Sequence, residues 1–140
     1  MLVHIPFTNA CLLLEMPVTL RKKIERLRQQ LHNTPSDSHS RVYLAWHLLE
    51  SGDRSNAIVE FFSAIASLNL EPKNDKAIQD LMSAHYGIGC ALYETGDIDQ
   101  AREHCASALE LYHERISDPF LYDRNRVVKS LRRLMSECTK

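Results

Sequence analysis

The chain has 140 residues, of which 44% are hydrophobic and 25% are charged, and its formal net charge is −1. These values are ordinary for a soluble globular protein of one domain, and no apolar run approaches the roughly 18–20 residues that a membrane-spanning helix needs. The chain has only four glycines and five prolines, which favours long helices over many short strands.

The first sixteen residues, MLVHIPFTNACLLLEM, are apolar but do not match a signal peptide. A basic n-region is missing, and Glu15 and Pro17 interrupt the apolar core that such a peptide requires. We expect residues 1–16 to be an N-terminal extension with little structure. Met16 is a second candidate for the natural start, because an ordinary helix pattern follows it.

The apolar periodicity of residues 17–140 predicts about six helices in a single domain, and no segment alternates as a strand would. A flanking helix over 19–32 has apolar residues at helical spacing: Leu20, Ile24, Leu27 and Leu31. Four further helices are expected over about 40–51, 54–70, 75–94 and 98–117. The last helix, over 119–138, has one apolar face: Phe120, Val127, Leu131, Leu134 and Cys138.

Turn and cap residues mark the boundaries of these helices. Gly52 and Gly96 can adopt the left-handed conformation that ends a helix, and Asp53, Asp75 and Asp97 are expected to cap the helices that follow them. Pro119 would occupy the first position of the last helix, after an Asp118 cap.

A segment of about 20 residues occurs twice in the chain, 44 residues apart. The Gly-Asp pair at 52–53 corresponds to the pair at 96–97. Small residues correspond as well: Ala57 with Ala101, Ala64 with Ala108, and Ala45 with Gly89, while Phe61 corresponds to Cys105. Small side chains let two helices approach closely, and larger ones such as Phe61 and Ile65 then fill the grooves of the neighbouring helix.

This pattern resembles the tetratricopeptide repeat (TPR), with two divergent copies at about 38–70 and 76–113. The resemblance implies an all-α, right-handed α-solenoid, a stack of antiparallel helical hairpins whose flanking helices cover the apolar ends. The usual period is about 34 residues, and the longer period here also fits HEAT-type repeats. HEAT-type repeats lack the Gly-Asp turn and the paired alanines, so the tetratricopeptide assignment is favoured.

In such folds the first helix of each hairpin lines a concave groove that binds other proteins. The resemblance places eleven residues on this face: His39, Val42, Tyr43, Trp46, Leu49, Glu50, Ser83, Tyr86, Cys90, Tyr93 and Glu94. Trp and Tyr are enriched at binding hot spots. Two interpretations fit this set equally well: a groove that grips a peptide or helical segment, or aromatic rings that a terminal helix covers.

The charge distribution indicates the chemistry of a partner. Residues 41–118 hold 6 Lys or Arg against 13 Asp or Glu, whereas residues 119–140 hold 6 against 2. A weakly acidic, aromatic groove suits an amphipathic segment with basic flanks. The carboxylate clamp of co-chaperones is not expected, because its Lys, Arg and Asn positions carry Val42, Trp46, Tyr86 and Cys90.

Other functions have weaker support. The sequence contains no phosphate-binding loop, nucleophile elbow or HExxH motif, so we expect neither an enzyme nor a cofactor. The seven His show no recurring ligand spacing, and a metal site is not expected. The basic residues of the last helix are more simply a solvated face than a nucleic-acid site. Four cysteines without a CxxC motif indicate reduced thiols and a cytoplasmic protein.

The sequence therefore predicts a non-enzymatic protein–protein interaction module, such as an adaptor, an assembly factor or a small chaperone. The alternative is a self-assembling, homo-oligomeric helical-repeat subunit, which exposed Phe62, Leu121 or Leu134 would drive.

Overall fold

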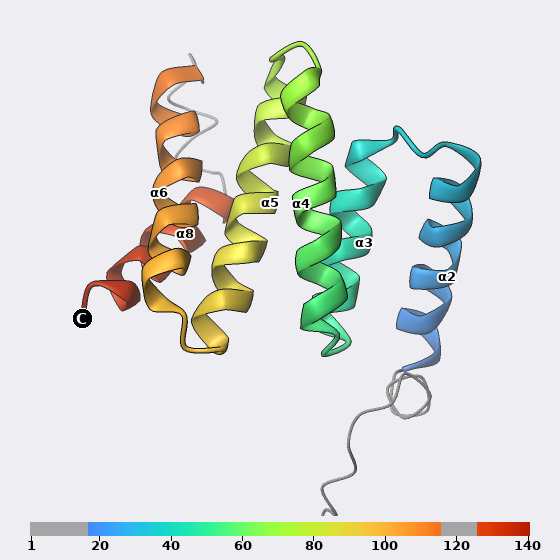
Figure 1. Ribbon diagram of the computed structural model, residues 1–140, viewed down its shortest axis with the longest axis horizontal. Coiled ribbons are helices and arrows are strands. Elements are labelled where there is room, and N and C mark those ends of the chain that lie inside the picture. The colour runs from blue at the N-terminus through green and yellow to red at the C-terminus, as the bar shows by residue number, and fades with distance from the viewer. Residues whose placement is uncertain (1–16, 116–125) are drawn as a thin grey trace, which may run out of the picture.

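The computed structural model describes residues 17–115 and 126–140 of the chain. Within these residues it contains six helices and no strand, which confirms the all-α prediction (Figure 1). The helices are α2 (Val18–Asn33), α3 (Ser38–Glu50), α4 (Arg54–Leu70), α5 (Asp75–Glu94), α6 (Ile98–Arg115) and α8 (Arg126–Cys138). The predicted extension at 1–16 and the predicted start of the last helix at 119–125 lie outside the described residues.

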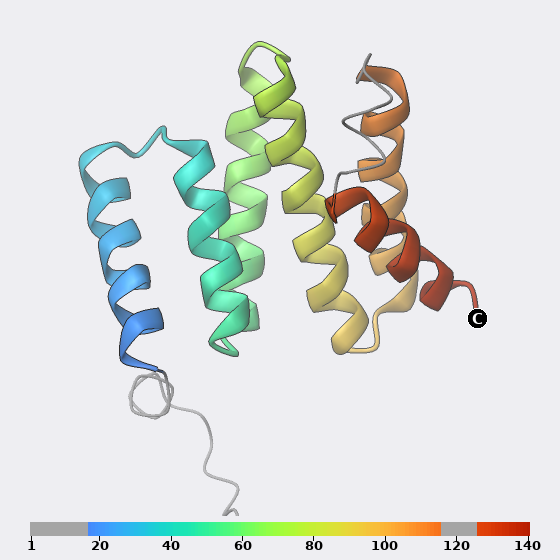
Figure 2. The same cartoon turned by 180° about the vertical axis from the view of Figure 1, so that it is seen from behind.

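The helices stack side by side as antiparallel hairpins. The first hairpin is α3 with α4 and the second is α5 with α6, and α5 packs against both helices of the first hairpin. In Figure 2, α3, α5 and α8 lie on the face toward the viewer, with α4 and α6 behind them. Helix α2 packs on α3 at one end of the stack, and α8 packs on α5 and α6 at the other end.

The two hairpin turns have the same geometry. Gly52 has a φ of 91° and Gly96 a φ of 89°. Residues with a Cβ atom rarely adopt such positive φ values. After each glycine an aspartate accepts a hydrogen bond from a backbone N–H three residues later, as an N-cap does: Asp53 from Asn56 and Asp97 from Gln100. These turn and cap predictions are therefore confirmed.

Small residues lie where the helices cross, as predicted. Ala45, Ala57, Ala64, Ala101 and Ala108 have no exposed surface. The ring of Phe61 on α4 is also fully buried, and its ring edge lies directly over Gly87 on α5. This contact joins the two hairpins, because the space that a Cβ would occupy at position 87 is filled by the ring.

The terminal helices complete two adjoining cores. Leu20, Ile24 and Leu31 of α2 join the larger cluster, which α3, α4 and α5 form. Leu131 of α8 joins a smaller cluster with Tyr112 of α6 and residues of α5. Each terminal helix thus covers one apolar end of the stack. Repeat arrays require such capping helices for solubility.

Three local predictions are wrong in detail. Asp75 does not cap α5, because Asn74 Oδ1 accepts the hydrogen bond from the Ala77 N–H at 2.8 Å and the helix begins one residue earlier than a cap at Asp75 requires. Helix α3 begins at Ser38 rather than at residue 40, with Asp37 as its cap. Leu134 is not an exposed contact for self-assembly, because it packs in the smaller core.

Candidate functional site

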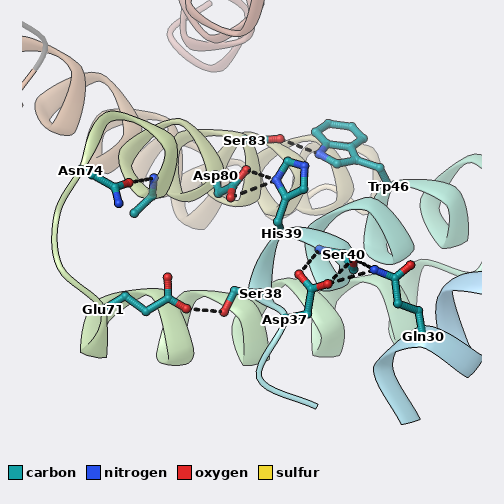
Figure 3. Close-up of polar contacts among 11 residues, drawn as sticks. Gln30, Asp37, Ser38, His39, Ser40, Trp46, Glu71, Asn74, Asp80 and Ser83 are labelled. Carbon is teal, nitrogen blue, oxygen red and sulfur yellow. Dashed lines mark hydrogen bonds and ion pairs between the residues drawn. The ribbon is translucent and has the colours of Figure 1, made fainter. Parts of the chain in front are cut away.

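The face on which the binding groove was predicted is formed by α3 and α5, whose side chains are joined by two hydrogen-bonded pairs (Figure 3). Nδ1 of His39 lies 2.9 Å from Oδ1 of Asp80, a carboxylate with only 7% of its residue surface exposed. About two turns further along α3, Nε1 of Trp46 donates to Oγ of Ser83 at 2.9 Å. These pairs fix the spacing between the two helices and leave little freedom to the side chains that form the face.

Trp46 is the centre of an aromatic cluster between the hairpins. Its ring lies 5.4 Å from that of Phe61 in an edge-to-face arrangement, and 5.4 Å from the tilted ring of Tyr86. Such pairs are worth roughly 0.5–1.5 kcal/mol beyond their buried area. Trp46 is therefore packed between the hairpins and only half-buried.

A groove of about 460 Å³ opens beside this cluster, at the end of the face where α3 and α5 finish. It is lined by Tyr43, Trp46, His47, Leu49, Glu50 and Glu94. Tyr43 is 52% exposed, although its ring makes an edge-to-face contact with His39 at 4.8 Å. An exposed aromatic beside a half-buried Trp and Leu gives the groove an apolar floor.

Carboxylates form the rim of this groove. Glu50 lies 3.6 Å from Nδ1 of His47, and Glu94 lies 3.4 Å from Nε of Arg54. Both carboxylates are more than half exposed, so both contacts are solvated and weak. A cationic group on a ligand can therefore compete for Glu50 and Glu94 without leaving a buried charge unpaired.

Helix α8 covers the other half of the predicted groove. Tyr86 shares a hydrogen bond with Ser130 and lies near Arg133, and Cys90 lies near Cys138. Burial raises the pKa of the Tyr86 hydroxyl and of the Cys90 thiol. Of the two interpretations of the aromatic residues, coverage by a terminal helix applies to this half, whereas no residue of 17–115 or 126–140 covers the half beside Tyr43.

The eleven predicted groove residues thus divide into five groups. The open groove contains five of them: Tyr43, Trp46, Leu49, Glu50 and Glu94. His39 and Ser83 hold the two helices together, while Tyr86 and Cys90 lie against α8; Tyr93 is half-buried outside the groove lining. Val42 was wrongly placed on the binding face: it is only 4% exposed, because it points into the core.

Two residues of this face were missed. His47 lines the groove one turn after Tyr43, and the i, i+4 spacing that places residues on one helix face could have identified it. Asp80 was missed because nothing local in the sequence shows that His39, 41 residues away, is its partner.

A second cleft, of about 250 Å³, lies among α4, α5 and α6, lined by Asn69, Leu81, His85, Ser107, Glu110 and Leu111. Nδ1 of His85 lies 3.0 Å from Nδ1 of His104, and the exposed ring of Phe62 packs edge-on against His104. Burial lowers the pKa of His85 to about 4 and also lowers the pKa of His104. Both imidazoles are therefore neutral near pH 7, and one of them donates to the other.

Two further findings concern the described residues alone. None of their helices combines the length and apolar character that a membrane crossing requires. Their His, Cys, Asp and Glu side chains form no group of three or more that could hold a metal ion.

Comparison with known families places residues 83–115, from the middle of α5 to the end of α6, in the tetratricopeptide repeat family. No curated protein matches the chain. This match covers 33 of the 140 residues and supports a tetratricopeptide-repeat-like helical stack. Such repeats generally mediate protein–protein interaction. The 44-residue period and the assignment of residues 38–70 to a first, divergent copy stay predictions.

Proposed function

We propose that this tetratricopeptide-repeat-like chain is a non-enzymatic interaction module, acting as an adaptor, an assembly factor or a small chaperone. It holds a short segment of another protein in the open groove between α3 and α5. The observation that carries this proposal is the exposed Tyr43 ring beside a half-buried Trp46, in a groove whose rim is acidic. Aromatic anchors in a preformed concavity are the side chains from which binding hot spots are built.

The rigidity of the groove floor supports a binding role. Trp46 is held by its hydrogen bond to Ser83 and by its contacts with Phe61 and Tyr86. A ligand that packs on it therefore meets a side chain whose rotamer is already fixed. Less conformational entropy is lost on binding to such a preorganised surface.

The charges define the partner that fits. Glu50 and Glu94 at the rim favour a segment that presents an apolar side chain to the groove and Lys or Arg beside it. A free C-terminal carboxylate does not suit this groove. The nearby Arg41 points elsewhere, because it pairs with Glu60 at 2.8 Å and donates to the carbonyl of Pro35.

The proposal is tested with a groove variant that leaves the packed aromatics intact, Tyr43→Ala/Glu50→Gln. Both side chains are exposed, so the variant should fold normally. Peptides selected by display on the wild-type protein should combine an apolar anchor with Lys or Arg. Their affinity, measured by fluorescence anisotropy, should fall at least tenfold in the variant, which corresponds to about 1.4 kcal/mol.

The matched control is Phe62→Ala/Glu103→Gln, which removes an exposed aromatic and an exposed carboxylate from α4 and α6 instead. It should bind the selected peptides as wild type does. Peptides that bind the groove variant and the control equally well would show that the groove is not the binding site.

Self-assembly is the alternative, and the exposed apolar residues of α4 favour it. Val59 is 61% exposed, and Phe62, one turn along on the same face, is 47% exposed. Sedimentation velocity at micromolar concentration distinguishes the two functions. A dimer that Val59→Ser/Phe62→Ser converts to a monomer supports self-assembly, whereas a wild-type monomer argues against it.

A further inference from the structure

A histidine on α3 adjoins the groove and has a buried carboxylate as its partner. His39 lies one helical turn before Tyr43, and the two rings meet edge to face with 4.8 Å between their centroids. The His39 side chain is 40% exposed, whereas its partner Asp80 is buried. In Figure 3, His39 and Trp46 both project from α3 toward α5. The face that contains the groove therefore continues along α3 as far as His39.

The contact with Asp80 fixes which ring nitrogen of His39 carries the proton. Nδ1 lies 2.9 Å from Oδ1 and 3.1 Å from Oδ2 of Asp80. An ionised carboxylate has no hydrogen to donate, so the proton of a neutral imidazole in this contact is on Nδ1. Nε2 then has a lone pair and can only accept a hydrogen bond. Within residues 17–115 and 126–140, no group forms a hydrogen bond with Nε2.

The position of this acceptor indicates what can bind to it. Glu50, on the rim of the groove, lies three helical turns further along α3, roughly 16 Å from His39. Both ends of the face thus accept hydrogen bonds, and the exposed ring of Tyr43 lies between them. An extended segment with N–H donors about five residues apart can reach both ends while its apolar side chain packs on Tyr43.

We infer, on the basis of the proposed function of the groove, that Nε2 of His39 accepts a hydrogen bond from an N–H group of the bound segment. Asp80 is the positioning residue that keeps Nε2 in its accepting state. The pair therefore selects among partner segments. Asp or Glu opposite His39 is disfavoured, because two acceptors would then face each other without a proton between them.

The probes are peptides of about 12 residues, selected on the wild-type chain from a displayed random library. This length spans the face in an extended or a helical conformation. Their affinities are measured by fluorescence anisotropy at about pH 8, where histidines are normally neutral and carboxylates ionised. His39→Ala and Asp80→Asn should each weaken binding roughly 3- to 10-fold, the range expected for one neutral hydrogen bond.

The matched control is Ser38→Ala. It removes a different bond of α3, the one that Ser38 Oγ donates to Glu71 Oε1 on the α4 side at 3.0 Å. This variant should bind the peptides as wild type does. Circular dichroism and urea unfolding check that all variants are folded under the conditions of the binding measurement.

A change of specificity distinguishes the positioning role of Asp80 from a purely structural one. In Asp80→Asn the amide can donate to Nδ1, which moves the proton of His39 to Nε2 and turns the acceptor into a donor. Side-chain ¹⁵N NMR, assigned with His39→Ala, should show this proton on Nδ1 in wild type and on Nε2 in the variant. Peptides reselected on Asp80→Asn should gain Asp or Glu.

The double variant His39→Ala/Asp80→Asn completes the test. Because Asp80 acts through His39, the double variant should bind no more weakly than His39→Ala alone. A further loss as large as that of Asp80→Asn in the wild-type background would overturn the positioning role. It would show that Asp80 only holds α3 and α5 together.

Two other outcomes separate this inference from the proposed function. Peptides that are weakened by Tyr43→Ala/Glu50→Gln but bind His39→Ala as tightly as wild type would overturn the role of His39 and leave the groove standing. A library that yields no binder, or binders insensitive to the groove variant, would overturn both. A wild-type proton on Nε2 would overturn the assignment of His39 as an acceptor.

Discussion

The ring of Phe61 on α4 occupies the space beside Gly87 on α5, so the two hairpins meet with no room for a side chain at position 87. Phe61 is fully buried, and its ring also makes an edge-to-face contact with that of Trp46, with 5.4 Å between the ring centroids. This contact links the packing of the two hairpins to the floor of the proposed groove. A substitution at Gly87 should therefore disturb both the packing of the two hairpins and the floor of the proposed groove.

Gly87→Ala should destabilise the protein. The added Cβ collides with the ring of Phe61, and overpacking of this kind costs roughly 1–3 kcal/mol, which exceeds the roughly 1 kcal/mol that Ala gains over Gly in a helix. Urea unfolding measures the difference. Gly89→Ala is the comparison, because its nearest neighbour would be Cys105 Sγ at 3.0 Å and the loss should be smaller. Adding Phe61→Leu to Gly87→Ala should recover part of the lost stability. A double variant no more stable than Gly87→Ala would show that the Phe61 ring does not cause the loss.

Gly52→Ala and Gly96→Ala should each lower the free energy of unfolding by a similar amount, roughly 1–2 kcal/mol. Both glycines have φ near 90°, and an added Cβ would meet no atom within 4 Å, so the cost is conformational at both turns. Asn tolerates positive φ better than Ala, so Gly→Asn at either site should lose less. Equal losses for Ala and Asn would show that the backbone relaxes at the turn.

The His85–His104 pair should make the protein less stable in mild acid. Burial holds the pKa of His85 at about 4, below the usual 6.5, so the unfolded chain binds the proton more readily than the native state. The stability from this pair is fully present above about pH 6.5 and is lost as the pH falls toward 4. Thermal unfolding from pH 8 to 4 measures this loss.

His85→Gln is the matched variant for that pH profile, because it keeps a polar side chain without a titrating ring. Its Tm should vary less than that of wild type between pH 6.5 and 4. Asp37, whose pKa stays low through its hydrogen bonds with Ser40 and Gln30 despite partial burial, titrates below this window. A wild-type profile that is flat above pH 4 would contradict the neutral His pair.

The hydrogen bond between Trp46 and Ser83 should be measurable by a double-mutant cycle. Trp46→Phe keeps an aromatic ring but removes the Nε1 donor, and Ser83→Ala removes its acceptor. We expect a coupling of about 0.5–1.5 kcal/mol in the free energy of unfolding. Additive losses would show that the two side chains are independent and that the groove floor is not fixed by this bond.

The sequence by itself determined the helices and their turns. Positive φ at Gly52 and Gly96 and the N-caps at Asp53 and Asp97 depend on a few neighbouring residues, so local chemistry was sufficient to predict them. The Ala spacing predicted which faces are buried, because helical periodicity is also local. Among the predicted caps that lie in the described residues, the one error, Asp75 in place of Asn74, arose because two adjacent residues both favour that position.

Only the tertiary structure decided which part of the predicted binding face helix α8 covers. Helix α8 covers Tyr86 and Cys90, and this could not be predicted, because its path across α5 depends on how Leu131 and Leu134 fit between α5 and α6. The burial of Val42 and the pairing of His85 with His104 depend likewise on contacts between helices. Local propensity fixes the direction of a side chain around its own helix, whereas packing against distant residues decides whether that direction leads to solvent, to the core or to a neighbour.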